Sequence, residues 1–266
     1  MIQSTDQLGN HFQWQDFPKR IISIVPSQTE YLFHLGLDIE VIGITRFCIH
    51  PRRWKKEKVN IGGTKTLNLP LIRSLNPDVI IGNKEENERA QIEELSGEFP
   101  VWMSDVPDLE RATGMMSEIG SLTGRIEAAT DITTKINAGF RELQKQISPS
   151  PKRVLYLIWY KPWMAAGPAT FIGDMIAKCG FQNVISAGGR YPELSPKEIM
   201  LLQPDVVFLS SEPFHFSGKH ERELREKLPT ARIIPVDGEY FSWYGSRLLD
   251  APEYFLSLCL PIQTAS

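Results

Sequence analysis

The sequence predicts an α/β protein built from two similar lobes, each with a mostly parallel sheet, joined by a long central helix and with a ligand cleft between them. Three observations predict this fold class. Short apolar segments alternate with helix-like segments, their order repeats in the two halves of the chain, and one apolar stripe with helical spacing lies between the halves. Alternating strands and helices are typical of parallel sheets that are covered by helices.

The two halves share a motif at the start of a predicted strand. Residues 74–87 read SLNPDVIIGNKEEN and residues 201–214 read LLQPDVVFLSSEPF, which places Asp78 and Asp205 at equivalent positions. Alone, such a motif is a common way to leave a helix and begin a strand. Further features recur in the same order in both halves, and this makes two related lobes the better interpretation.

The first lobe alternates strand and helix in a regular order. A buried strand IISIVPS is followed by a helix TEYLFHLGL that ends near Gly36, the short strand VIGI, a helix over 69–75, the strand of the shared motif and the strand PVWMSD. Ser27 and Glu30 have the spacing of a capping box at the start of the first helix.

The second lobe repeats this order. The strand VLYLIWY is followed by a helix FIGDMIAKCGF that ends near Gly180, the short strand NVIS, a helix over 196–202, the strand of the shared motif and the strand RIIPVD. Each element has a counterpart in the first lobe.

An apolar stripe predicts the helix that joins the lobes. From Ile119 to Ile147, positions separated by alternating steps of three and four residues are apolar except at Thr133. This predicts a linking helix over 119–148, between an N-terminal lobe at 18–118 and a C-terminal lobe at 151–260. Gly124 and Gly139 weaken such a helix, and a break or an earlier start at Gly124 is the alternative. The stripe also fits the seam of a coiled-coil dimer. A strut within one chain is preferred, because the flanking lobes offer apolar surface to cover it.

Composition excludes several classes of protein. A net charge of -3 without a long basic run argues against nucleic-acid binding. No apolar run approaches the roughly 20 residues that span a bilayer. The first twenty residues contain no apolar signal segment, which predicts a cytoplasmic protein, or a periplasmic or membrane-associated one if a signal has been removed. The three cysteines lack zinc-type spacing and are expected to be reduced and buried: Cys48, Cys179 and Cys259.

Ligands of open α/β sheets bind outside the carboxyl ends of the strands, so the residues there are candidates for a site. In the first lobe these include His50, in the loop TRFCIHP, and Gly63, in IGGTK. A neutral imidazole can ligate a metal, and paired glycines let the backbone approach a ligand closely. A bystander histidine and a plain turn explain the same features.

The corresponding loops of the second lobe are rich in aromatic residues. Rings in loops with glycine, proline and serine more often line a pocket or interface than a core, and about half of these are expected to face the cleft. They are Trp159, Tyr160, Trp163, Tyr191, Tyr240, Phe241, Trp243 and Tyr244.

Sequence motifs of catalysis are missing. The chain has no GxSxG, HExxH or paired His/Cys zinc spacing, and no GxGxxG follows the first strand. The sequence therefore predicts a binding protein that is not an enzyme and has no intrinsic cofactor.

The segments RIISIVPSQTEYLFHLGL, VIGITRFCIHP, LIRSLNPDVIIG and GGRYPELSPKEIMLLQPDVVFLSS, with the long helix between them, resemble the helical-backbone substrate-binding proteins of ABC importers. The resemblance covers about residues 18–260 and is strongest to the cobalamin-binding branch. It implies binding of a metal-centred macrocycle or chelate without chemistry, a corrinoid first and then haem or an iron–siderophore complex, with His50 as an axial metal ligand. By this resemblance the pocket positions fall on Phe47, His50, Trp159, Trp163, Tyr191, Tyr240, Phe241 and Trp243.

The resemblance also implies an ABC permease as a partner of a monomeric protein. Family members that dock on a permease carry a glutamate on each lobe, whereas this chain has Pro70 at the first position and Lys197, beside Glu198, at the second. Two other functions fit the sequence. One is a cytoplasmic chelatase-like or corrinoid-processing enzyme on a similar bilobal fold, and the other is an aromatic-rich module that binds another protein.

Overall fold

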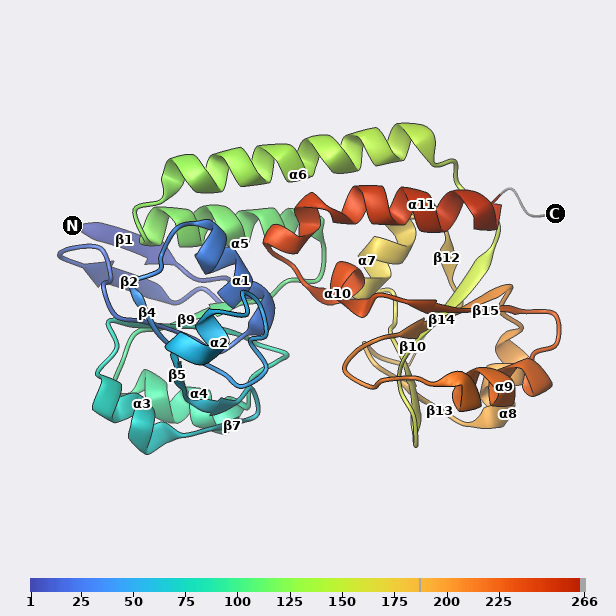
Figure 1. Ribbon diagram of the computed structural model, residues 1–266, viewed down its shortest axis with the longest axis horizontal. Coiled ribbons are helices and arrows are strands. Elements are labelled where there is room, and N and C mark those ends of the chain that lie inside the picture. Colours follow the sequence, from blue (N-terminus) through green and yellow to red (C-terminus); the bar gives the residue numbers. More distant parts are fainter. Residues whose placement is uncertain (187, 264–266) are drawn as a thin grey trace. The chain divides into compact units, whose positions relative to one another are not determined.

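Two β-sheets organise the chain, one in each of the two units into which its contacts divide it (Figure 1). This computed structural model describes residues 1–186 and 188–263. Unit 1 comprises Met1–Val106, Glu110–Lys135 and Tyr244–Arg247, and unit 2 comprises Pro107–Leu109, Ile136–Trp243 and Leu248–Ser266. Two α/β units with mainly parallel sheets confirm the predicted fold class.

Unit 1 is built around a five-stranded sheet in the order β5-β4-β3-β8-β9, in which every neighbouring pair is parallel. Two small antiparallel hairpins, β1-β2 and β6-β7, accompany it. The strands and the helices before the linking region are β1 Ile2–Thr5, β2 His11–Trp14, β3 Ile21–Ser23, α1 Pro26–His34, β4 Val41–Ile44, α2 Trp54–Glu57, β5 Val59–Asn60, β6 Gly62–Gly63, β7 Thr66–Leu67, α3 Leu69–Leu75, β8 Val79–Asn83, α4 Arg89–Ser96, β9 Val101–Ser104 and α5 Leu109–Leu122.

Helices cover both faces of this sheet. Ile72 of α3 and Leu95 of α4 pack in one apolar cluster with strand residues such as Ile80. On the other face α1 and α5 are joined, because the Tyr31 hydroxyl donates a hydrogen bond of 2.7 Å to the Met116 carbonyl. Figure 1 shows the two helix pairs on opposite sides of the strands of unit 1. The continuously apolar strands follow from this burial on both faces.

Unit 2 has a mixed sheet in the order β13-β11-β10-β14-β15, with β12 also paired to β10. The pairs β10-β14, β14-β15 and β10-β12 are parallel, whereas β11 pairs antiparallel with both β10 and β13. Its elements are β10 Arg153–Trp159, β11 Trp163–Ala165, α7 Phe171–Lys178, β12 Gln182–Asn183, β13 Glu193–Leu194, α8 Pro196–Leu202, β14 Val206–Ser210, α9 Gly218–Lys227, β15 Arg232–Val236, α10 Gly238–Ser242, the 3-10 turn η1 Ser246–Leu249 and α11 Ala251–Gln263.

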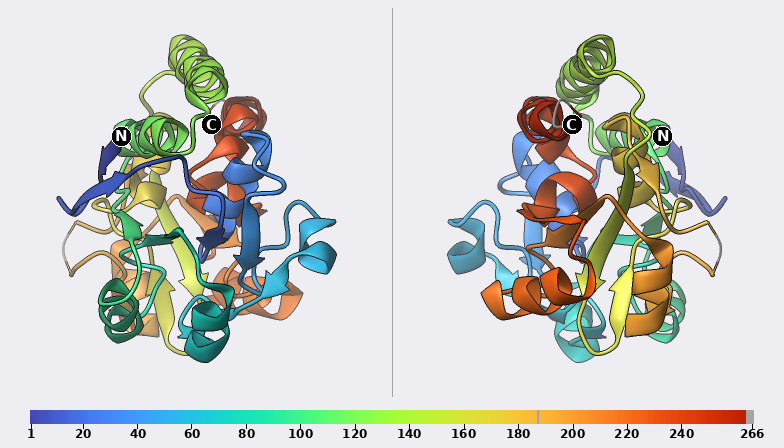
Figure 2. Two further views of the ribbon diagram at one scale, coloured as in Figure 1. Left: turned by 90° about the vertical axis from the view of Figure 1, so that its left-hand side faces the viewer. Right: turned by 90° about the vertical axis from the view of Figure 1, so that its right-hand side faces the viewer.

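The helices of unit 2 also form two layers. Ile199 of α8 and Leu224 of α9 join one apolar cluster on the sheet, while Phe255 of α11 and Phe241 of α10 pack together at 4.7 Å between ring centroids in another. Figures 1 and 2 show α8 and α9 below the strands β14 and β15 of unit 2, and α10 and α11 above them.

The shared motif has the same structural role in both units. In unit 1 the Asp78 carboxylate accepts the backbone N–H groups of Lys19 at 2.8 Å and Arg20 at 2.9 Å, just before β3. In unit 2 the Asp205 carboxylate accepts the backbone N–H of Arg153 at 2.7 Å, at the start of β10. In both units the aspartate that precedes one strand therefore holds the beginning of the neighbouring strand.

The predicted linking helix is interrupted. α5 ends at Leu122, and α6, Ile126–Gln146, begins after a short connection. Gly124 has φ +68, and the Arg125 N–H donates to the Gly120 carbonyl at 2.7 Å, as in a Schellman helix end. The single helix predicted from Ile119 is therefore wrong at its start. α6 contributes to both units, since Lys135 belongs to unit 1 and Ile136 to unit 2.

The predicted capping box at the first helix is also wrong. α1 begins at Pro26, and its N-cap residue is Val25, which makes no side-chain cap. Ser27 therefore lies inside the first turn, and its hydroxyl is buried without a hydrogen-bond partner among the described residues. None of the helices in the described ranges has the length and apolar character that crossing a membrane requires.

Candidate functional site

The loops at the carboxyl edge of the unit 1 sheet are held together by Asn87, which is 4% exposed. Its side-chain oxygen accepts the Asn83 N–H at 2.8 Å at the end of β8. Its amide donates to the Ile24 carbonyl at 3.2 Å and to the Thr64 carbonyl at 3.1 Å. Three loops from distant parts of the chain therefore meet at this edge, where ligands of such sheets bind.

Phe47 is the most exposed aromatic side chain on this edge, at 49%. The Arg46 guanidinium lies over its ring, 5.0 Å from the centroid. Gly63 lies directly against this pair: a Cβ there would be 3.2 Å from both Arg46 Nη2 and Phe47 Cε2. The paired glycines predict that a group approaches the backbone closely here. In the structure, the groups that approach Gly63 are the side chains of Arg46 and Phe47 and not a ligand.

The remaining loop residues differ in accessibility. His50 is half-buried and precedes Pro51. Cys48 is fully buried, with its sulfur 3.1 Å from Thr29 Oγ1 and 3.2 Å from Thr45 Oγ1, and burial raises the pKa of the thiol. Cys48 is therefore structural, as predicted. In residues 1–186 and 188–263, no group of three or more His, Cys, Asp or Glu side chains could hold a metal ion.

A four-residue segment from near the end of the chain completes unit 1. The Tyr244 hydroxyl donates to Glu86 Oε1 at 2.6 Å, and Arg247 Nη2 lies 2.7 Å from Glu30 Oε1. The side chains of Glu30 and Arg247 are only 11% and 17% exposed. Tyr244, predicted as one of the loop rings, is 6% exposed and serves to fix this segment.

In unit 2, a ring cluster forms where β10 ends. The Trp159 ring is 39% exposed and packs edge-on against Phe214 at 5.6 Å. Trp163 is 4% exposed, and its ring lies 4.7 Å from that of Tyr160. His220 also belongs to the cluster, since its ring is 4.5 Å from Tyr160. His220, near the start of α9, is thus packed among aromatic rings.

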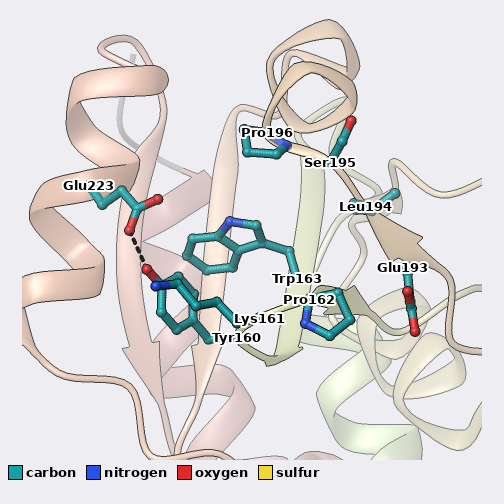
Figure 3. Close-up of a pocket in the computed structure, with 9 residues that line it drawn as sticks. All are labelled: Tyr160, Lys161, Pro162, Trp163, Glu193, Leu194, Ser195, Pro196 and Glu223. Carbon is teal, nitrogen blue, oxygen red and sulfur yellow. Dashed lines mark hydrogen bonds between the residues drawn. The ribbon is translucent and has the colours of Figure 1, made fainter.

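A pocket of about 400 Å³ opens beside this cluster (Figure 3). The Tyr160 hydroxyl donates to Glu223 Oε2 at 2.9 Å, which fixes the ring at one side of the pocket. Sequence reasoning found the two rings of the pocket but not its prolines and carboxylates. Pro162 lies between β10 and β11, and Glu193, Pro196 and Glu223 come from β13, α8 and α9. The lining residues are Tyr160, Lys161, Pro162, Trp163, Glu193, Leu194, Ser195, Pro196 and Glu223.

The aromatic residues after β15 differ in how far their side chains are buried. Phe241 is fully buried, with ring centroids 5.0 Å from Tyr156 and 4.7 Å from Phe255. A buried ring offers no face to a ligand, so the structure removes Phe241 from the candidate site. Tyr240 is half-buried and stacks on Tyr254 at 4.4 Å.

Trp243, which follows α10, is 6% exposed, and its indole N–H donates to Glu212 Oε1 at 2.8 Å. The Ser242 hydroxyl donates to the same carboxylate oxygen at 2.5 Å. Burial raises the pKa of Glu212, against the effect of these two hydrogen bonds. Trp243 is thus held in place and has little exposed surface. Tyr191, in the loop before β13, is half-buried.

The candidate site residues therefore fall into three groups by accessibility. Phe47 and Trp159 present open ring surface, while His50, Tyr191 and Tyr240 are half-buried. The remaining ones are buried: Gly63, Trp163, Phe241 and Trp243.

The fold and these loops define a class of α/β binding proteins, and comparisons identify the family. Residues 21–230 match the family described as periplasmic binding protein, and the chain belongs to this family. It is 23% identical to a vitamin B12-binding protein of Pectobacterium atrosepticum over 256 residues, 93% of this chain and 91% of that protein.

Solved structures show the same fold. The periplasmic vitamin B12-binding protein BtuF of Vibrio cholerae matches with a TM-score of 0.81 and 21% identity, over 93% of this chain and 99% of BtuF. The periplasmic heme-binding protein RhuT from Roseiflexus matches with a TM-score of 0.74 and 26% identity, over 91% of this chain and 99% of RhuT. The predicted family resemblance is confirmed.

Proposed function

We propose that the protein binds a metal-centred macrocycle or chelate without catalysis, with a corrinoid as the first candidate and haem or an iron–siderophore complex next. The similarity to proteins named for vitamin B12 and for heme over more than nine-tenths of the chain supports this proposal most strongly. The exposed rings of Phe47 and Trp159 support it independently, because flat aromatic faces suit a large planar ligand.

The proposed contacts follow the accessibility of the side chains. In unit 1, Phe47 would supply stacking area. In unit 2, Trp159 would supply an exposed ring, and Tyr191 and Tyr240 would add edges with hydroxyl groups. His50 would supply an axial nitrogen to the metal, since a neutral imidazole is a suitable ligand for cobalt or iron.

Titration tests the proposal. The full chain is titrated with cobalamin, cobinamide, haem and ferric siderophores, while ligand absorbance and tryptophan fluorescence are recorded. We expect at least one ligand to bind with a Kd below about 100 μM, which corresponds to roughly -5.5 kcal/mol. If all bind more weakly, the proposed function is wrong. Turnover of a tetrapyrrole with a divalent metal would instead indicate the enzyme alternative.

A pair of variants locates the site on unit 1. Phe47→Ala should weaken binding about 2- to 10-fold, because one aromatic stacking contact contributes roughly 0.5–1.5 kcal/mol. Phe17→Ala is the matched control, since Phe17 is 47% exposed on the same unit but precedes β3, away from the carboxyl edge. Equal losses in both variants would contradict the assignment of Phe47.

We further propose an ABC permease as partner. Lys197 is exposed at the first turn of α8, and Glu198 is engaged in a capping box, where it accepts the Ser195 N–H at 2.7 Å. A permease whose docking surface is built to meet a glutamate on each lobe would not match these charges. The partner permease is therefore expected to have a different docking surface. Stimulation of a candidate permease's ATP hydrolysis by the liganded protein would test this. Cell fractionation distinguishes a periplasmic location of the protein from a cytoplasmic one.

A further inference from the structure

Arg46 is an exposed cation at the carboxyl edge of the unit 1 sheet. It lies in the loop that also carries Phe47 and His50, immediately after β4. Its backbone N–H donates to the Gly62 carbonyl at 2.8 Å, which joins this loop to the β6-β7 hairpin. The position of Arg46 is therefore fixed by hydrogen bonding of the main chain, although its side chain reaches the surface.

The side chain of Arg46 is also constrained. Its guanidinium stacks over Phe47 at 5.0 Å and lies near the backbone of Gly63, where a Cβ would come within 3.2 Å of Nη2. Stacking on a ring uses the face of the guanidinium and leaves its N–H groups, which lie in the plane, able to donate. The N–H donors of the Arg46 guanidinium thus lie beside the exposed surface of the Phe47 ring.

No carboxylate of the described residues forms an ion pair with Arg46. Two lysines of this edge are engaged: Lys84 pairs with Asp105 at 2.8 Å, and Lys65 donates to the Glu85 carbonyl at 2.6 Å. The Glu86 carboxylate accepts the Tyr244 hydroxyl. Among the described residues, Arg46 is therefore a cation of this edge that is stacked on an exposed ring and has its donors available for a ligand.

We propose that Arg46 binds an anionic group on the ligand while the flat body of the ligand lies against Phe47. This inference rests on the proposed function and narrows its ligand class to chelates that carry a phosphodiester, carboxylate or catecholate anion. Arginine suits this role, because its fork matches the two oxygens of a carboxylate or phosphate.

Three pairs of probes test the proposal, each pairing an anionic compound with one that lacks the anion. They are cobalamin with cobinamide, which lacks the phosphodiester, haem with haem dimethyl ester, and a ferric tris-catecholate with a neutral ferric trihydroxamate. Each is titrated against the unmodified chain and Arg46→Gln, with Arg46→Lys as a second variant. We expect Arg46→Gln to weaken binding of the anionic member at least ~10-fold, about 1.4 kcal/mol, and that of its partner less than ~2-fold.

Arg52→Gln is the matched control, because Arg52 is also exposed on unit 1 and has no ion pair among the described residues. Arg52→Gln should change the affinity for neither the anionic compound nor its partner. Arg46→Lys should retain part of the preference for the anion, since it keeps the charge but loses the fork.

The outcomes separate the two proposals. If the unmodified chain binds a pair and Arg46→Gln weakens both members equally or neither, the anion site is refuted while the binding function stands. If none of the six compounds binds, the proposed function is refuted and the anion site with it. The pair that shows the selective loss identifies the source of the anion.

Discussion

Removing Arg247 should destabilise unit 1 more than the loss of an ordinary surface ion pair. Its guanidinium lies 2.7 Å from Glu30 Oε1, with side chains 17% and 11% exposed. Breaking a buried pair by removing one partner typically costs about 3–5 kcal/mol, because a charge is left in a poorly solvated place. The remaining exposure of both groups reduces this, and we expect Arg247→Met to lower the free energy of unfolding by about 2–4 kcal/mol.

Urea unfolding at 25 °C, followed by circular dichroism, measures this change. Arg89→Met is the control, because Arg89 pairs with Glu93 at 2.6 Å but the two side chains are 89% and 62% exposed. Arg89→Met should lower the free energy of unfolding by about 0.5 kcal/mol or less. The double variant Glu30→Gln with Arg247→Met should be more stable than Arg247→Met alone. Equal effects of Arg247→Met and Arg89→Met, or a strictly additive double variant, would refute the reasoning.

Three further predictions concern both units. Phe241→Ala should cost about 3–5 kcal/mol in urea unfolding, because the ring is fully buried; a loss below 1 kcal/mol would contradict its place in the core. Asp78→Ala should destabilise more than Asp205→Ala by about 1 kcal/mol, because Asp78 accepts two backbone N–H groups and Asp205 one; equal losses in calorimetry would contradict this. Burial raises the pKa of Glu212, so the folded state favours its protonated form, and this stability is lost as pH rises through the folded pKa. Glu212→Gln should therefore lose less stability than the unmodified chain as pH rises from roughly 4 towards 7, and parallel stability profiles would refute it.

The sequence predicted those elements whose ends are marked by local chemistry. The helices over 69–75 and 196–202 are confirmed at both ends. Asn68 and Ser195 cap their starts, and Asn76 and Gln203 adopt the left-handed conformation at their ends. Where local signals competed, the prediction was wrong: Pro26 begins the first helix one residue before Ser27, and Gly124 interrupts the linking helix.

The site was harder to predict, because the exposure of a ring depends on residues far away in the sequence. Phe241 lies in a loop-like segment with glycine and serine, yet Phe255 of α11 and Tyr156 of β10 bury it. Phe47 remains open, although it has no more polar neighbours in the sequence than Phe241. Arg46 was not singled out, since nothing in the sequence shows that its charge lacks a carboxylate partner.

The route of the chain has a consequence for biosynthesis. Glu30 and Glu86 are made early, but the donors that meet them, Arg247 and Tyr244, lie within the last 23 residues. A ribosome synthesises the chain from its N-terminus, so these two contacts of unit 1 cannot form until nearly the whole protein has been made. A truncated product that ends after residue 135 would lack Tyr244 and Arg247, which contact these two carboxylates in the full chain.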